Sequence, residues 1–254
     1  MDTTMNRLAA YIAISSLCLT GTALGAAEGT AVGVRPDALA RAASDERVLV
    51  VGADVSVGET IVTGPRGNVQ LLFDDQTRLV VGPGSTLEIE TYLLAGSGAD
   101  TFAVNALAGT FRFISGNSPK SAYSIDTPTA SIAVRGTEFD LTVGGGRSFV
   151  LLYEGALTIC RSSNCVNLAN RCDIGAVAGS SANLLTWQDD ERDRLVSNFP
   201  LSNIQSSFLP PFRVSGGQAC LAPPAQSASE SLVDGATGRP APVQNQPCTD
   251  PQNC

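Results

Sequence analysis

The residues that could carry out chemistry in this 254-residue chain are mainly carboxylates, because the sequence contains no histidine. Histidine is the usual general base, proton shuttle and metal ligand near neutral pH, so its absence removes the commonest catalytic designs. Asp74 and Asp75 are adjacent, and Glu88 and Glu90 follow a short distance along the chain. Such groups could bind calcium or serve a glycosidase. However, Asp74-Asp75-Gln76-Thr77 lies between two alternating apolar runs, which favours a turn shaped by local hydrogen bonds, and Glu88 and Glu90 fall on the outward positions of their strand.

A serine nucleophile activated by lysine is a second chemical possibility. Lys120 is the only lysine in the chain, and Ser118 and Ser121 lie close to it. Hydrolases of this type place the serine three residues before the lysine, where this chain has Asn117. We therefore expect Lys120 to be a loop charge. The sequence also lacks a Gly-x-Ser-x-Gly elbow and a dinucleotide fingerprint.

The segment Arg135-Gly136-Thr137-Glu138 is the most attractive candidate for a ligand site. A structural role explains each residue: Gly136 permits a backbone conformation that other residues avoid, Thr137 can hydrogen-bond within a bend, and Arg135 can pair with Glu138 or another carboxylate. We favour the structural interpretation over a ligand role.

Charge and composition exclude several classes of partner. The chain carries 16 basic and 24 acidic residues, a formal net charge of −8. A surface that neutralises nucleic-acid phosphates is therefore not expected, and there is no polybasic segment that would bind a membrane. We expect no nucleic-acid partner, no cofactor and no metal.

The cysteines are concentrated in the last hundred residues. Apart from Cys18, they are Cys160, Cys165, Cys172, Cys220, Cys248 and Cys254. An even number of cysteines in an exported protein predicts disulfides, and six cysteines allow 15 pairings that the sequence cannot distinguish. Zinc would need a tetrahedral ligand set, which the irregular spacing and the absence of histidine disfavour.

Export is indicated by the first 25 residues. A positive charge at Arg7, an apolar run from Leu8 to Leu19 and small residues before Ala26 predict a cleaved signal peptide over 1–25. The alternative is a membrane anchor, but this apolar run is shorter than the roughly 20 residues that span a bilayer. We expect a periplasmic or secreted protein with no membrane span after cleavage.

From Val48 to about Ile159 the apolar residues alternate with period two. Val69, Leu71 and Phe73 show this pattern, and so do later segments up to Ile159. Turn sequences rich in glycine separate the runs at short intervals, and none of the gaps has a helical period. Short alternating strands with regular turns predict an all-β fold.

A series of motifs follows the same order and spacing as those of a known family. The matching segments are Gly58–Ile61, Val69–Leu79, Gly82–Leu87, Gly109–Phe113, Thr127–Ala130, Val134–Phe139 and Tyr153–Leu157. Over Val50–Cys160 the chain resembles the FecR domain, the extracytoplasmic part of the FecR iron-dicitrate regulators and of many other exported bacterial proteins. The motif residues for which we expect structural roles are Thr127, Pro128, Val134, Arg135, Gly136, Thr137, Glu138, Phe139 and Gly155.

The resemblance implies short strands wound into a solenoid-like, twisted β stack, with a Greek-key β-sandwich as the alternative. The family commonly has Asp-Gly where this chain has Asp75-Gln76, so this turn must form without glycine. FecR regulators also place an anti-sigma domain and a membrane helix before this module. Here we expect only the signal peptide, so the resemblance does not by itself imply contact with a sigma factor.

The rest of the chain differs from the β region in composition and in hydrophobic pattern. We expect an N-terminal arm or short helix over 26–47, the β domain over 48–160, and a cysteine-stapled extension over 161–221. One short helix is predicted at about 186–196, where Thr186 can cap it and acidic residues fill the first turn. Residues 222–254 are rich in proline, serine and alanine and are predicted to be disordered.

These features predict an exported, non-catalytic FecR-like module that binds an unknown protein partner in envelope or surface signalling. The recognition surface would be an exposed β face or edge. An alternative is a structural component of an envelope assembly. A carboxylate-based hydrolase is the third possibility.

Overall fold

The computed structural model describes residues 27–43, 45–95, 98–185 and 194–222. The predicted signal peptide over 1–25 and nearly all of the predicted tail over 222–254 lie outside these residues. Among the described residues, no helix has both the length and the apolar character needed to cross a bilayer.

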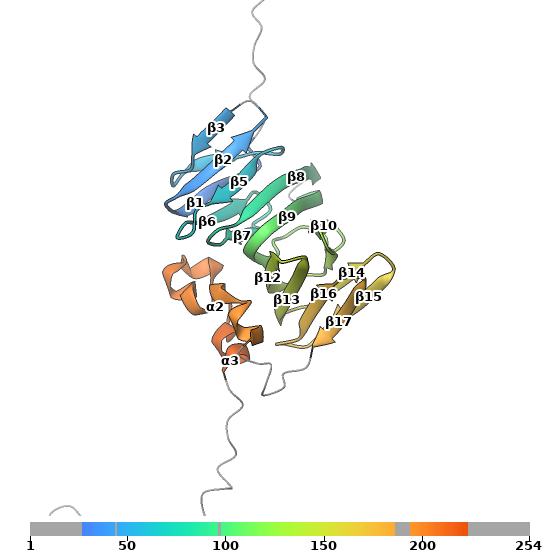
Figure 1. Cartoon of the computed structure of the whole chain (residues 1–254). Coiled ribbons are helices and arrows are strands. Elements are labelled where there is room, and N and C mark those ends of the chain that lie inside the picture. Colours follow the sequence, from blue (N-terminus) through green and yellow to red (C-terminus); the bar gives the residue numbers. More distant parts are fainter. Residues whose placement is uncertain (1–26, 44, 96–97, 186–193, 223–254) are drawn as a thin grey trace, which may run out of the picture.

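Most of the described chain is β-strand, which confirms the predicted all-β fold (Figure 1). The strands are β1 (Gly29–Arg35), β2 (Ala38–Ala42), β3 (Asp45–Val48), β4 (Ala53–Val55), β5 (Thr60–Thr63), β6 (Asn68–Phe73), β7 (Arg78–Val81), β8 (Thr86–Ala95), β9 (Gly98–Ile114), β10 (Tyr123–Asp126), β11 (Ser131–Val134), β12 (Glu138–Gly144), β13 (Arg147–Glu154), β14 (Leu157–Arg161), β15 (Asn164–Leu168), β16 (Ile174–Ala178) and β17 (Ser181–Leu185).

The strands form two faces, and the chain passes repeatedly from one to the other. On face A the pairing order is β4-β1-β6-β7-β9-β12-β13-β16-β17. On face B it is β3-β2-β5-β8-β9-β10-β11-β14-β15. Apart from the first strands, each order follows the chain, so the molecule grows from its N-terminal end to its C-terminal end (Figure 1). This progression is that of the predicted solenoid-like stack rather than a Greek key.

Strand β9 belongs to both faces. Its first part pairs with β8 and β10 on face B, and residues 109–114 pair with β7 and β12 on face A. The chain changes face at Gly109, whose φ is +106°. A Cβ atom at this position would lie 2.2 Å from the Ser85 hydroxyl oxygen, so both the backbone conformation and the close approach require glycine.

The core lies between the two faces and is built from the alternating residues that the sequence predicts to be inward. Leu71 and Phe113 enter it from face A, and Leu87 and Phe102 enter it from face B; each is at most 2% exposed. The packing leaves an apolar cavity of about 10 Å³ between the faces, room for about one water molecule at most.

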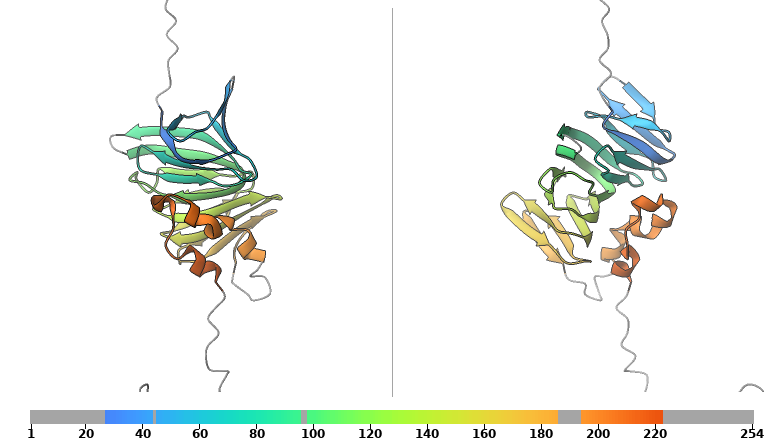
Figure 2. Two further views of the ribbon diagram at one scale, coloured as in Figure 1. Left: turned by 90° about the vertical axis from the view of Figure 1, so that its left-hand side faces the viewer. Right: turned by 180° about the vertical axis from the view of Figure 1, so that it is seen from behind.

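The outer side of face A is covered by a helical segment that ends the described chain (Figures 1 and 2). It contains α2 (Pro200–Ile204), α3 (Gly217–Leu221) and two single 3₁₀ turns at Gln205–Ser207 and Pro210–Phe212. Phe208 and Phe212 pack on Val80, and Phe199 packs near Tyr153. We call residues 194–222 the helical cover.

Two predictions about the ends of the domain need correction. Residues 26–47 were predicted to form an arm or a helix, but β1, β2 and β3 occupy most of this segment, and β1 pairs with both β4 and β6. The Ala-rich piece at 38–43 has helical propensity, yet pairing with β5 holds it as a strand. The single helix predicted at 186–196 falls mostly outside the described residues; 194–197 are helical, and further helices follow it.

The predicted extension over 161–221 continues the β stack before it forms the helical cover. Strands β15, β16 and β17 lie within it, and β16 extends face A by pairing with β13. The β pattern therefore runs past Cys160, where the sequence analysis ended it.

Candidate functional site

The acidic pair at Asp74 and Asp75 forms a turn, as the sequence predicts. The Asp75 carboxylate is fully buried and accepts hydrogen bonds from Thr77 N at 2.9 Å, Ser118 Oγ at 2.5 Å and Tyr123 Oη at 2.9 Å. Gln76 takes a left-handed φ of +69°, the conformation for which the family uses glycine. The carboxylate is therefore bonded within the turn through Thr77, and across to Ser118 and Tyr123 from the loop before β10 and the start of β10, so the arrangement is structural.

Of the other residues considered for catalysis, Ser118 is buried and donates to Asp75, and Ser121 is exposed in the loop before β10. Glu88 accepts a hydrogen bond from Asn105 Nδ2 at 3.1 Å across the β8–β9 pair, and Glu90 is exposed. Lys120 is exposed in the loop before β10, as predicted. The described residues contain no group of three or more cysteine or acidic side chains that could hold a metal ion.

The Thr127-Pro128 motif builds the turn between β10 and β11. Thr127 Oγ1 accepts from the backbone N of Ala130 at 2.8 Å and shares a 2.9 Å hydrogen bond with Ser148 Oγ. The carbonyl oxygen of Pro128 accepts from Arg161 Nη1 at 3.4 Å. These bonds join the turn to β13 and β14.

The motif over 134–139 and Gly155 are placed by backbone contacts. Val134 and Phe139 are buried in the core, and Thr137 N donates to Ser115 Oγ at 2.9 Å. Gly136 has a φ of +70° and Gly155 has a φ of +83°. A Cβ atom on Gly155 would lie 2.0 Å from the Gly136 carbonyl oxygen, so the two strand ends can touch only if residue 155 is glycine.

Arg135 differs from the rest of this motif. Its backbone N donates to the Ala156 carbonyl at 3.0 Å, but its side chain is exposed. Within the part of the chain that the structure describes, the guanidinium forms neither of the ion pairs that the sequence analysis suggested, with Glu138 or with another carboxylate. Gly136 thus has a structural explanation. The buried Thr137 hydroxyl has no hydrogen-bond partner among the described residues, contrary to the bond predicted within the bend, and the exposed Arg135 side chain has no ion-pair partner there.

Glu138 stands directly opposite Glu154 on β12 and β13. Burial raises the pKa of Glu138, and the neighbouring Glu154 carboxylate raises it further. Arg78, Arg112 and Arg171 act in the opposite direction. Burial and the facing Glu154 carboxylate both favour the protonated form of Glu138.

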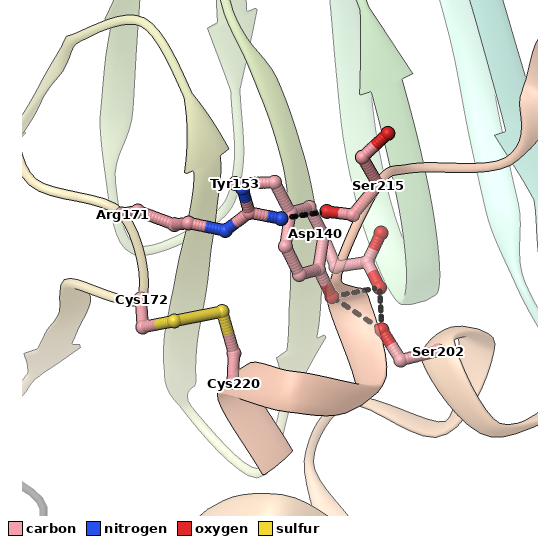
Figure 3. Close-up of a disulfide and its surroundings, with 7 residues drawn as sticks. All are labelled: Asp140, Tyr153, Arg171, Cys172, Ser202, Ser215 and Cys220. Atoms are coloured by element: carbon pink, nitrogen blue, oxygen red, sulfur yellow. Dashed lines mark hydrogen bonds between the residues drawn. A yellow bond between two sulfur atoms is a disulfide. The ribbon is translucent and has the colours of Figure 1, made fainter. Parts of the chain in front are cut away.

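Arg112 and Asp140 form a buried ion pair that the sequence analysis missed. The carboxylate accepts from Arg112 Nε at 2.7 Å and from Nη2 at 2.8 Å, and both side chains are at most 2% exposed. Tyr153 Oη donates to the same carboxylate at 2.8 Å, and Ser202 from the helical cover adds a contact at 3.3 Å (Figure 3). Burial alone would lower the pKa of Arg112, but Asp140 raises it overall; burial raises the pKa of Tyr153.

This ion pair occupies the outer side of face A, where alternation alone predicts solvent. The charge is hidden because the helical cover, about 90 residues further along the chain, lies over it (Figure 2). The signal in the sequence is an arginine and an aspartate at outward positions of strands that pair in register, Arg112 opposite Asp140.

Four of the six candidate cysteines form disulfides in the described residues. Cys160 pairs with Cys165 across the β14–β15 hairpin. Cys172 pairs with Cys220 and ties the loop before β16 to α3 (Figure 3). Cys248 and Cys254 lie outside the described residues.

The two ends of the stack differ in their exposed apolar surface. Four of the eight large apolar side chains that the described residues expose lie at the N-terminal end. They are Val48 at the end of β3, Val50 and Val51 between β3 and β4, and Val57 after β4, with exposures of 67%, 60%, 65% and 42%. We call these four residues, with strands β3 and β4, the valine end.

The valine end also contains two unpaired strand edges. Strand β3 pairs with β2, and β4 pairs with β1. In the described residues no register joins another strand to the outer edge of either. At the C-terminal end, β15 and β17 likewise have one strand partner each among the described residues, but these two strands pack against each other, and the Cys160–Cys165 disulfide closes the β14–β15 hairpin. The valine end is therefore the more open end of the stack.

The comparison with protein families agrees with the motifs. Residues 59–158 match the family model described as FecR protein. Two crystal structures of a candidate anti-sigma factor from Parabacteroides distasonis ATCC 8503, at 1.65 and 2.50 Å resolution, align with a TM-score of 0.42 and 16% identity. Each alignment covers 53% of this chain and 62% of that chain. No curated protein matches the sequence.

Proposed function

Since the chain carries a FecR domain at residues 59–158, we propose that it is an exported, non-catalytic signalling module that binds a protein partner through the valine end. The observation that carries the proposal is the concentration of exposed valines beside two unpaired strand edges. The proposed location, in the periplasm or outside the cell, is supported by the signal-peptide pattern at 1–25.

The edges of β3 and β4 offer backbone groups to an incoming strand. An extended peptide can add to such an edge through main-chain hydrogen bonds, while its side chains contact apolar residues beside the edge. The exposed valines supply this apolar contact. Three of them are at least 60% exposed, so a partner that covers them removes apolar surface from water, which favours binding. An added strand would pair with β3 or β4 through main-chain hydrogen bonds, as neighbouring strands of the stack already pair with each other.

Charges around the valine end specify the kind of segment that fits. Arg47 contacts Glu59 at 2.8 Å, so these two charges neutralise each other. Asp45 and Asp54 are exposed, and no ion pair of either appears among the described residues. The rim is therefore acidic, and it complements an extended apolar segment flanked by lysine or arginine.

The proposal is tested by a photo-crosslinking side chain at position 51 in the full chain, expressed in its native cells. We expect one adduct with a protein of defined mass that is larger than the chain itself. The matched control carries the crosslinker in place of Leu184, which is 46% exposed in β17 at the other end of the stack, and it should give no such adduct. Adding Val50→Lys to the position-51 variant should remove the adduct.

Two outcomes would overturn the proposal. An adduct containing two copies of this chain would favour the alternative, in which stacked modules form a structural assembly. Adducts of equal yield from positions 51 and 184 would show that the valine end has no special role.

A further inference from the structure

The two disulfides of the described chain are built very differently. Cys160 and Cys165 are five residues apart and lie directly opposite each other on β14 and β15, with a Cα–Cα distance of 4.0 Å. Cys172 and Cys220 are 48 residues apart and connect the β stack to the helical cover. A disulfide restricts the unfolded chain less when it closes a shorter loop, so the first bond is the weaker structural constraint.

The β14–β15 hairpin is held by other contacts as well. Leu157 and Leu168 face each other at its base, and both are at most 1% exposed. Thr158 Oγ1 donates to Asn167 Oδ1 at 2.7 Å. Strand β14 also pairs with β11 along four residues. Because these contacts fix the hairpin independently, the Cys160–Cys165 bond can open without releasing the strands.

The same bond is accessible to solvent. Cys165 is exposed and Cys160 is partly exposed, whereas in the other disulfide Cys172 is partly exposed and Cys220 is only 5% exposed. Thiol–disulfide exchange requires an attacking thiolate to reach one sulfur along the S–S axis, so exposure controls which bond reacts. Exposed disulfides that contribute little to the stability of the fold are the ones most readily reduced by thiols.

We propose that Cys160–Cys165 is a thiol-exchange site that takes a dithiol as its reactant. A thiolate of the dithiol attacks Cys165 Sγ, a mixed disulfide forms, and the bond to Cys160 breaks. Cys160 leaves as a thiolate and takes up a proton. The second thiol of the reactant then attacks its own mixed-disulfide sulfur and releases Cys165, so the protein gains two electrons and two protons while the dithiol becomes a disulfide. This site is independent of the valine end, which lies at the other end of the stack (Figure 1).

The test is timed reduction of the full oxidised chain with dithiothreitol, quenched with iodoacetamide and mapped by peptide mass spectrometry. We expect Cys160 and Cys165 to be alkylated at least tenfold faster than Cys172 and Cys220. The far-UV circular dichroism should be unchanged when only the first pair is reduced. In guanidinium chloride the difference in rate should disappear, because both bonds are then equally accessible.

A second measurement tests which sulfur is attacked. Reduced glutathione should leave a mixed disulfide on Cys165 in preference to Cys160, because Cys165 is the more exposed residue of the two. Equal rates for both disulfides in the folded chain would overturn the proposal, and so would a Cys160–Cys165 bond that is reduced only on unfolding. A glutathione adduct found mainly on Cys160 would overturn the assigned direction of attack.

Discussion

Removing the charge of Asp140 tests how the helical cover is held on the β stack. Asp140→Asn keeps the shape of the side chain but leaves the Arg112 guanidinium without a counter-charge, in a position that is fully buried. The amide nitrogen would also face Arg112 Nη2 or Nε, both of which are donors. Breaking a buried ion pair by removing one partner costs about 3–5 kcal/mol.

The expected result is a large loss of stability. For a chain of this size, about 1 kcal/mol corresponds to about 2–4 °C in melting temperature, so Asp140→Asn should lower it by about 6–20 °C. Thermal melts followed by far-UV circular dichroism measure this directly. The matched control is Glu46→Gln, which breaks the Arg41–Glu46 pair, whose side chains are 51% and 52% exposed; it should cost less than about 1 kcal/mol.

A double variant separates the ion pair from simple loss of packing. Arg112→Met with Asp140→Leu removes both charges and keeps most of the volume, so it should be more stable than Asp140→Asn alone. Two results would contradict this account. One is an Asp140→Asn variant that melts within about 2 °C of the natural protein, and the other is a double variant that loses as much stability as Arg112→Met alone and Asp140→Leu alone lose together.

Three further predictions concern turns and titration. Gly155→Ala should lower the free energy of unfolding by more than about 2 kcal/mol, because its Cβ atom would meet the Gly136 carbonyl oxygen. The control Gly145→Ala has a φ of +57° and open space around its Cβ atom, so it should cost only about 1 kcal/mol. Equal losses of stability for the two variants in urea unfolding would contradict this. Gln76→Gly should stabilise the protein by up to about 1 kcal/mol, because it relieves a left-handed φ at an exposed side chain; a lower urea midpoint would refute it. The pKa of Glu138 is raised in the folded state, so its stabilising contribution is present at low pH and is lost as the pH rises through the folded value. Glu138→Gln should therefore be more stable than the natural protein at pH 7, and this advantage should be smaller at pH 4. An equal change in melting temperature at both pH values would contradict the raised pKa.

The β stack could be predicted from the sequence because apolar and polar residues alternate along its strands. Val69, Leu71 and Phe73 were predicted to share one face and are buried, and Asp75 shapes the predicted turn. The N-terminal strands were missed because Ala38–Ala42 is short and rich in alanine, and only its pairing with β3 and β5 makes it a strand. Local propensity does not contain that long-range pairing.

The buried ion pair was missed for a related reason. Arg112 and Asp140 occupy outward positions, and period-two alternation assigns such positions to solvent. Only the helical cover makes this side of face A an interior, through contacts such as Arg112 Nη1 to Gln205 Oε1 at 3.0 Å. Conversely, Arg135 was expected to pair with a carboxylate but is exposed. It lies in the bend between β11 and β12, so its side chain need not face Glu138 at the start of β12.

The most direct test of the proposed function is amide hydrogen exchange of the full chain with and without the partner recovered through the position-51 crosslink. The proposal predicts new protection of the amides of β3 and β4 on binding, with no change in β15 or β17. Protection confined to another part of the stack, or none at β3 and β4, would contradict binding through the valine end.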